Sequence, residues 1–417
     1  MRVPFGPGRV GGGEDDDLMS EITSAEVLHF VNTVFGGLDE AAQELIRGCL
    51  RREVIACGEV LWSAGQPAEN IAFVLRGRLQ VAVIEADGDL RGAGEIGRGQ
   101  ALGVAEVVGR RSRVATVRAM RETEILLLSG TDFEEVVGLA PAFVVPLMRS
   151  LATRLGAALR GEQSFRAPET VAIVPLAEGM DLKSLVEQMQ SLAEHYVSVH
   201  SVDADRVDQK FGEGRGRGPL QGAEHEALAS WLDELDDTHE FDLYVADPGD
   251  TPWTRRCLAR ADRILLVAPA GASPALKPVE QLFADGGPVP NDAHRELLLL
   301  HPAGTSQPQG TAAWLRLRAV ERRHHVRSGR SDDLARVVRR LLGRCVGLVL
   351  SGGAARGMCH IGLIRGLQGA GVPIDAVGGA SAGGGVGVLL AADLSPAEIV
   401  RAIQETWLES RVFTRPK

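Results

Sequence analysis

The sequence predicts a multidomain protein in which a β-barrel with flanking helices precedes an α/β domain and the N-terminal part of a second α/β domain. Three observations support this. The chain has 417 residues, more than one hydrophobic core usually fills. Its apolar pattern changes from a period of two to an alternation of apolar strands and amphipathic helices. Two glycine-rich turns, each between a strand and a helix, follow near the C-terminus.

Composition narrows the class of protein. The net charge is −10, and five cysteines are scattered without a Cys-x-x-Cys pair, which predicts a reducing compartment and no metal site. Residues 1–17 lack the apolar core of a signal peptide, and we expect a disordered tail there. No apolar run reaches the roughly 18 residues of a spanning helix. We therefore expect a cytoplasmic protein, with peripheral membrane contact as the alternative.

The first domain is expected over residues 18–165. Apolar residues at helical spacing predict two short helices between Leu18 and Leu50. Alternating apolar and polar residues then predict about eight short strands, with a hairpin turn at Asp87-Gly88. A helical tail, roughly from Thr131 to Leu159, is expected to close this unit. Two helices, a barrel of short strands and a C-terminal helix resemble the cyclic-nucleotide-binding domain, whose strands form a jelly roll.

The resemblance is clearest in residues 97–119, GRGQALGVAEVVGRRSRVATVRA, which match the phosphate-binding cassette of that family. In the cassette a glycine-rich turn and an arginine bind the cyclic phosphate, and a glutamate binds the ribose hydroxyl. The resemblance therefore implies a cyclic-nucleotide site, with cAMP or cGMP as a regulator. Its residues here would be Gly103, Arg113, Ala115 and Thr116.

The glutamate position of the cassette holds Val104, and Glu106 lies two residues further on. Valine cannot accept the ribose hydrogen bond, and an unmet buried polar group costs about 1–3 kcal/mol. Two alternatives stay open: a domain that binds a nucleotide, and a degenerate domain that only regulates or docks. In the second, Arg113 is an ordinary surface ion-pair residue.

An α/β domain is expected over residues 166–315, because apolar strands such as VAIVPL and ADRILLVAP alternate with helices. Residues 241–270 resemble the deviant nucleotide-hydrolysing ATPases, in which an aspartate such as Asp247 helps to hold magnesium. The first strand, however, leads into AEGMDLKSLV, where Leu182 replaces the glycine of a phosphate loop before Lys183-Ser184. We predict no ATP hydrolysis and interpret Asp247 as a loop residue.

Residues 316–344 hold ten arginines and three acids, a local charge of +7. We predict a solvated connector helix for this segment. The alternative is peripheral contact with anionic lipid headgroups. No signature of a nucleic-acid-binding fold is present, and we expect no nucleic-acid partner.

Two glycine-rich motifs, which follow one another in residues 345–417, indicate a catalytic site. Residues 351–357 read S-G-G-A-A-R-G after a predicted strand, and residues 379–383 read G-A-S-A-G after another. The second has the G-x-S-x-G form, which places a serine at a sharp turn between a strand and a helix. Together they resemble the patatin-like phospholipases. The added N-terminal barrel narrows the resemblance to the bacterial relatives of neuropathy target esterase.

The resemblance implies a serine esterase that hydrolyses a phospholipid or lysophospholipid through an acyl-enzyme and requires no cofactor. Ser381 would be the nucleophile. The oxyanion hole would consist of Gly352, Gly353 and Ala354, with Arg356 and Gly357 shaping the turn and Gly379 and Gly383 flanking the serine.

No base for Ser381 is evident. The family pairs its serine with an aspartate in a D-G-G or D-G-A motif far downstream, and Asp393 is the sole aspartate after Ser381. We interpret His360 as a packing residue and Asp285, in ADGGPVPND, as part of a turn. We expect little or no hydrolysis, and a chain that is C-terminally truncated or completed by a second polypeptide. The runner-up function is a non-catalytic protein that senses a cyclic nucleotide or docks on a membrane.

Overall fold

The computed structural model describes residues 40–84, 90–159, 169–220, 222–284, 286–289 and 291–409. The predicted tail at 1–17, most of the predicted helical region before residue 40, the Asp87-Gly88 turn and Asp285 lie outside the described residues. The chain divides into two compact units, residues 1–328 and 329–417.

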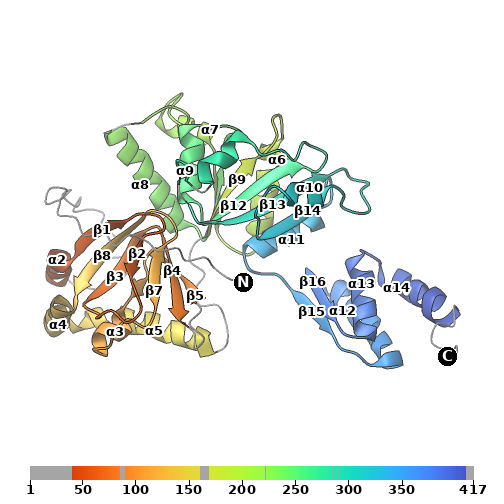
Figure 1. Ribbon diagram of the computed structural model, residues 1–417, viewed down its shortest axis with the longest axis horizontal. Helices are drawn as coiled ribbons and strands as arrows, with labels where there is room; N and C mark the ends of the chain where they lie inside the picture. The colour runs from red at the N-terminus through yellow and green to blue at the C-terminus, as the bar shows by residue number, and fades with distance from the viewer. Residues whose placement is uncertain are drawn as a thin grey trace. The chain divides into compact units, whose positions relative to one another are not determined.

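The first unit begins with an antiparallel jelly roll of two four-stranded sheets, which confirms the predicted fold of this part (Figure 1). The sheet orders are β1-β8-β3-β6 and β2-β7-β4-β5. Apolar side chains on alternate strand positions fill the space between the sheets. The strands are β1 (Arg51–Ile55), β2 (Val60–Trp62), β3 (Asn70–Arg76), β4 (Arg78–Ile84), β5 (Leu90–Gly97), β6 (Ala101–Leu102), β7 (Thr116–Ala119) and β8 (Thr123–Ser129).

Helices pack on the outer face of the first sheet and form a second apolar core there. They are α2 (Glu40–Cys49), α3 (Val104–Val108), α4 (Gly130–Leu139), the 3-10 turn η1 (Pro141–Phe143) and α5 (Val144–Leu159). The helical tail that we expected from about Thr131 to Leu159 is present, but it is interrupted at Ala140. Pro141 lacks an N–H and disfavours the helical conformation at Ala140, whose φ and ψ are −133° and 69°.

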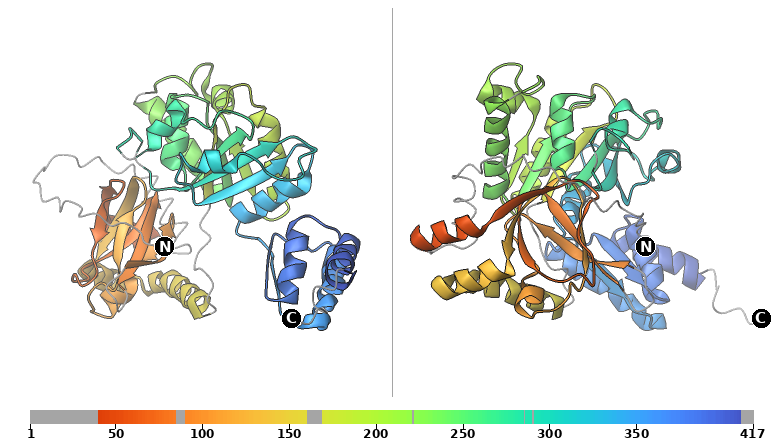
Figure 2. Two further views of the ribbon diagram at one scale, coloured as in Figure 1. Left: turned by 45° about the vertical axis from the view of Figure 1, so that its right-hand side comes forward. Right: turned by 60° about the vertical axis from the view of Figure 1, so that its left-hand side comes forward.

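A six-stranded parallel sheet follows in the order β10-β11-β9-β12-β13-β14. Its apolar runs predict a sheet that is covered on both faces, and the central strands are buried. The barrel strands and this sheet form separate groups of strands in both views of Figure 2. The strands are β9 (Glu169–Pro175), β10 (Val199–Val202), β11 (Phe241–Val245), β12 (Arg263–Pro269), β13 (His294–His301) and β14 (Arg322–Arg327).

The helical segments between these strands are α6 (Leu182–Ala193), α7 (Ala204–Phe211), α8 (Ala223–Thr238), α9 (Pro252–Arg260), η2 (Pro278–Phe283) and α10 (Thr311–Leu315). In the described part of the chain, no helix is long and apolar enough to cross a bilayer.

The arginine-rich segment 316–344 is not a connector helix. Its first half contains β14, which pairs in parallel with β13, and helix α11 (Ser331–Leu341) begins only afterwards. The sequence R-R-H-H-V-R alternates, and His324 and Val326 are buried while the intervening residues are less so. Arginines on an edge strand also discourage pairing with another chain. The prediction failed because it relied on the high arginine content of this segment and overlooked the alternation of buried and exposed positions.

The second unit contains α11 and a two-stranded parallel sheet of β15 (Gly347–Leu350) and β16 (Ala376–Gly379). Arg339 of α11 donates to Asp375 at 2.6 Å, and the N–H of Val346 donates to the same carboxylate at 3.0 Å. Burial opposes ionisation of Asp375, but these hydrogen bonds outweigh it and lower the pKa. The remaining elements are η3 (Ala354–Met358), α12 (Cys359–Gly369), α13 (Ala382–Ala391), α14 (Pro396–Ile403) and a π-helical turn, η4 (Gln404–Glu409).

Candidate functional site

Ser381 stands at the sharp turn between β16 and α13. Its φ of 51° and ψ of −123° lie outside the regions that residues with a side chain usually occupy. The flanking glycines permit the turn. A Cβ on Gly383 would lie 2.4 Å from the Leu350 carbonyl oxygen, and one on Gly379 would lie 2.6 Å from the carbonyl carbon of Gly383. The turn is therefore compatible with glycine alone at both positions, and the serine side chain is exposed.

The glycine-rich turn after β15 lies directly beside Ser381. Leu350 and Gly379 are paired in the parallel sheet, so both strands end at the same edge. A Cβ on Gly352 would lie 3.2 Å from the Cβ of Ser381. One on Gly357 would lie 2.5 Å from the Cβ of Ala382. The structure thus brings together the two motifs that are separated in the sequence.

Backbone donors are available in this turn. Within the described residues, no backbone acceptor takes the N–H of Gly352 or Gly353, whereas the N–H of Arg356 donates to Gly353 at 3.0 Å. Ala354 has a φ of 47°, in the left-handed region that favours glycine. Alanine therefore keeps the N–H of this position but adds strain. Such uncommitted N–H groups next to a serine can stabilise an oxyanion.

The described residues place no base against Ser381, since none of their histidine, aspartate or glutamate side chains hydrogen bonds to it. The Nε2 of His360 lies 2.9 Å from the carbonyl oxygen of Ser351, where it supports the glycine-rich turn. Asp393 follows α13, and its Oδ2 lies 3.8 Å from Nη2 of Arg330. A serine without a base remains protonated and is a weak nucleophile.

In the barrel, Gly103 and Arg113 are in contact. Gly103 has a φ of 81°, and a Cβ there would lie 2.3 Å from Nη1 of Arg113. The arginine is only 5% exposed, its Nη2 donates to the Asn70 carbonyl oxygen at 2.6 Å, and its guanidinium carbon lies 3.5 Å from the ring centre of Trp62. Arg113 is therefore not a surface ion-pair residue. Sequence reasoning missed Trp62, although it is the only tryptophan in the barrel.

The Arg113 site fits an anion better than it fits a ribose. Its Nε and Nη1 have no hydrogen-bond acceptor in the described part of the chain. Burial lowers the pKa of this guanidinium, against the opposing effect of Glu106 and Glu69. Val104 is buried in the apolar core between the first sheet and its helices and cannot accept a hydrogen bond. Of the other cassette positions, Ala115 is buried and the Thr116 hydroxyl accepts the Ala64 N–H at 3.1 Å.

The carboxyl edge of the parallel sheet is occupied by the protein's own charges. Asp247, after β11, accepts Nε and Nη2 of Arg217 at 3.1 and 3.0 Å, while Nη1 of the same arginine donates to Asp205 at 2.7 Å. The hydrogen bond to Asp205, followed by that to Asp247, raises the pKa of Arg217. The Asp181 carboxylate accepts the Ser184 N–H at 3.0 Å and caps α6. A phosphate at this helix N-terminus would meet that carboxylate, so the geometry disfavours nucleotide binding.

Three family models match successive parts of the chain: "Cyclic nucleotide-binding domain" over residues 52–138, "Neuropathy Target Esterase family P-loop like domain" over 168–343, and "Patatin-like phospholipase" over 348–415. The resemblance to neuropathy target esterase is confirmed. The three matches follow the chain in the order that the sequence motifs predicted.

Relatives align over most of this chain. "Patatin-like phospholipase domain-containing protein 7" of Rattus norvegicus is 30% identical over 401 residues, which are 85% of this chain and 29% of the relative. "Patatin-like phospholipase domain-containing protein 6" of Homo sapiens is 28% identical, with the same shares. "Lysophospholipase NTE1" of Coccidioides immitis is 29% identical over 82% of this chain and 26% of its own length. The chain therefore spans less than a third of each of these relatives.

Two solved structures are similar over about a third of the chain. One is the N-terminal domain of a transcriptional regulator from Streptomyces coelicolor A3(2), with 23% identity, a TM-score of 0.27, and coverage of 33% of this chain and 99% of that one. The other is a regulatory subunit of a cAMP-independent protein kinase A from Trypanosoma cruzi bound to guanosine, with 23% identity, a TM-score of 0.29, and coverage of 32% and 50%.

Proposed function

We propose that this chain carries the nucleophile and the oxyanion hole of an esterase that cleaves the acyl ester of a phospholipid or lysophospholipid. The observation that carries the proposal is the strained turn at Ser381, with Gly352 packed against the serine. Relatives described as lysophospholipases and patatin-like phospholipases support the lipid ester as substrate class.

In the proposed reaction, Oγ of Ser381 attacks the ester carbonyl carbon while its proton passes to a base. The N–H groups of Gly352, Gly353 and Ala354 stabilise the negative oxygen of the tetrahedral intermediate. As the intermediate collapses, the base passes the proton to the leaving oxygen, the neutral alcohol departs, and an acyl-Ser381 ester remains. Water then hydrolyses this ester, releases the fatty acid and restores the serine.

None of the described carboxylates or imidazoles hydrogen bonds to Ser381, so the proposed reaction needs a base that these residues do not place against the serine. Alone, the chain is expected to hydrolyse lysophospholipid weakly or not at all. Loss of one member of a catalytic triad lowers turnover by roughly 10⁴-fold or more.

The test combines a fluorophosphonate probe with a lysophosphatidylcholine assay on the purified chain. Slow labelling that mass spectrometry locates at Ser381, and that Ser381→Ala abolishes, supports the proposal. Ser351→Ala, in the neighbouring turn, is the matched control and should still be labelled. A small carboxylate such as formate should accelerate labelling by acting as the absent base. Labelling that persists in Ser381→Ala, or hydrolysis that does not depend on this serine, would contradict it.

We also propose that cAMP or cGMP binds the barrel through its cyclic phosphate and regulates the esterase. The two unsatisfied nitrogens of buried Arg113 support this proposal. Because Val104 cannot hold the ribose, affinity should be one to two decades weaker than with a glutamate there. Calorimetry with both nucleotides tests it: heat that is lost in Arg113→Ala supports binding, and no heat with the wild-type chain favours the degenerate domain.

We also propose peripheral membrane contact through residues 316–344, but only some of the ten arginines in this segment can take part. Arg318 is buried against Glu280 at 2.7 Å, and Arg339 pairs with Asp375, so neither is available to a lipid. Several other arginines, including Arg322 and Arg330, are exposed. Flotation with anionic liposomes that weakens steeply with salt would support this contact.

A further inference from the structure

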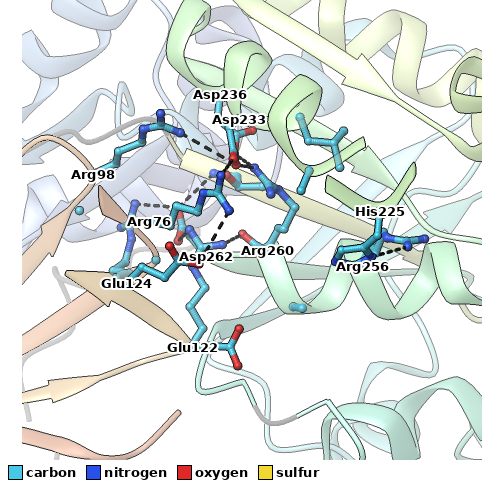
Figure 3. Close-up of a pocket in the computed structure, with 18 residues that line it drawn as sticks. Arg76, Arg98, Glu122, Glu124, His225, Asp233, Asp236, Arg256, Arg260 and Asp262 are labelled. Carbon is cyan, nitrogen blue, oxygen red and sulfur yellow. Dashed lines mark hydrogen bonds and ion pairs between the residues drawn. The ribbon is translucent and has the colours of Figure 1, made fainter. Parts of the chain in front are cut away.

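A cavity of about 350 Å³ lies within the first unit, between the barrel and the amino edge of the parallel sheet (Figure 3). Thr170, in β9, and Asp262, just before β12, mark this edge, which is opposite to the one that carries Asp247. Six arginines line the cavity: Arg76, Arg78, Arg98 and Arg121 from the barrel, and Arg256 and Arg260 from α9.

The cavity contains fewer facing carboxylates than guanidinium groups, and several of the carboxylates are shared. Asp233 lies 2.5 Å from Arg76, 2.7 Å from Arg260 and 3.9 Å from Arg98. Asp262 contacts two further barrel arginines at 2.7 and 3.2 Å. Asp236 pairs with Arg260, and Glu124 lies 3.7 Å from Arg76 of the cavity as well as against Arg52 outside it. Glu95 of the barrel pairs with Arg78 at 2.7 Å. The exposed Glu122 lies apart from this group in Figure 3.

Arg256 has no carboxylate partner among the described residues. Its Nη2 lies 3.2 Å from Nδ1 of His225, and its Nη1 is buried without an acceptor in that part of the chain. Nε of Arg121 and Nε of Arg260 are also buried without an acceptor there. Figure 3 shows the Arg256–His225 pair to one side of the Asp233, Asp236 and Arg260 group. Buried guanidinium N–H groups without an acceptor are unfavourable, and a ligand with several oxygen atoms could accept hydrogen bonds from more than one of them.

We propose that this cavity binds a small phosphate-bearing anion, with Arg256 as the principal contact and the neighbouring guanidinium groups as further donors. A phosphate has several strong acceptor oxygens that can take the unpartnered guanidinium donors, and guanidinium forks match its geometry. The volume suffices for a phosphate or a small phosphate monoester. Because arginines from the barrel and from α9 face the same cavity, a bound anion joins the two parts. The proposal does not depend on the chemistry at Ser381.

The experiment is calorimetry at constant ionic strength on the full chain, with inorganic phosphate and with glycerol 3-phosphate. Flotation with phosphatidic acid vesicles tests whether a lipid headgroup is the source of the phosphate. Arg256→Gln should weaken binding by roughly tenfold or more, since it removes a charge-assisted donor. Arg255→Gln is the matched control on the same helix, because Arg255 is exposed and pairs with Asp250 at 2.7 Å. It should change the affinity by less than about twofold.

A second variant allows the proposal to be tested even if Arg256→Gln fails to fold. Arg98→Gln removes a guanidinium from the barrel side of the cavity and should also weaken binding several-fold. Circular dichroism establishes that each variant is folded. The proposal is overturned if no probe binds more tightly than about 10 mM. It is equally overturned if Arg255→Gln reduces binding as much as Arg256→Gln, or if the folded variants Arg256→Gln and Arg98→Gln bind like the wild type.

Discussion

His294 should make the stability of the first unit depend on pH between about 6.5 and 9. This histidine, at the start of β13, contacts Glu321 at 2.5 Å and Glu95 of the barrel at 3.2 Å. The hydrogen bond to Glu95 is the main cause that raises the pKa of His294 from its ordinary 6.5 to about 9. Because the folded-state pKa is the higher one, the charged imidazole stabilises the fold fully below pH 6.5. That stabilisation is lost as the pH rises to about 9.

The magnitude follows from the size of the pKa change. A shift from 6.5 to about 9 corresponds to at most about 3 kcal/mol. The side chain of His294 is 38% exposed, so solvent screening reduces the expected contribution to about 1 kcal/mol. Replacement by glutamine should therefore lower the free energy of unfolding by about 1 kcal/mol at pH 6 and by almost nothing at pH 9.5.

Urea unfolding of the wild type and of His294→Gln at several pH values measures this difference, and proton NMR of the imidazole gives the pKa directly. His195→Gln is the control, because His195 is exposed in the turn after α6 and its Nδ1 lies against the Ser191 carbonyl oxygen of that helix. A difference between wild type and His294→Gln that stays constant from pH 6 to 9.5, or a measured pKa near 6.5, would refute the reasoning.

Three further predictions concern close packing and buried charge. Gly383→Ala forces a Cβ to within 2.4 Å of the Leu350 oxygen and should destabilise the second unit by about 1–3 kcal/mol, measured by limited proteolysis after α11. Asp375→Ala leaves the nearly buried Arg339 without its carboxylate and should cost about 3–5 kcal/mol in urea unfolding, whereas a loss below about 1 kcal/mol would mean that solvent replaces the pair. Gly103→Ala should displace the Arg113 guanidinium and weaken cyclic-nucleotide binding at least tenfold in calorimetry, without lowering thermal stability by more than a few degrees.

The sequence predicted the parts of this fold that depend on local pattern. The alternation of apolar and polar residues predicted the strands of the jelly roll, and the continuous apolar runs predicted the parallel sheet. The two glycine motifs were correctly expected to follow strands, because a strand-to-helix turn of this kind requires small residues. The structure adds that Gly352 and Ser381 lie side by side. This was implied by resemblance, since parallel pairing of two distant strands is not visible in either segment alone.

Predictions failed or fell short where distant residues decide the outcome. The arginines of β14 indicated a solvated helix, whereas pairing with β13 makes this segment a strand. The partners of Arg217 and Arg256 come from other elements, and no local signal identifies them. Arg113 was expected from the cassette motif, but its stacking on Trp62 depends on how the loop before β7 lies against β2.

The link from Arg217 to Asp247 and Asp205 bears on how this protein responds to its surroundings. An aspartate that already holds a guanidinium gains little from magnesium, and a helix end that carries its own carboxylate repels a triphosphate. Changes in cellular ATP or free metal should therefore leave the middle domain unaltered.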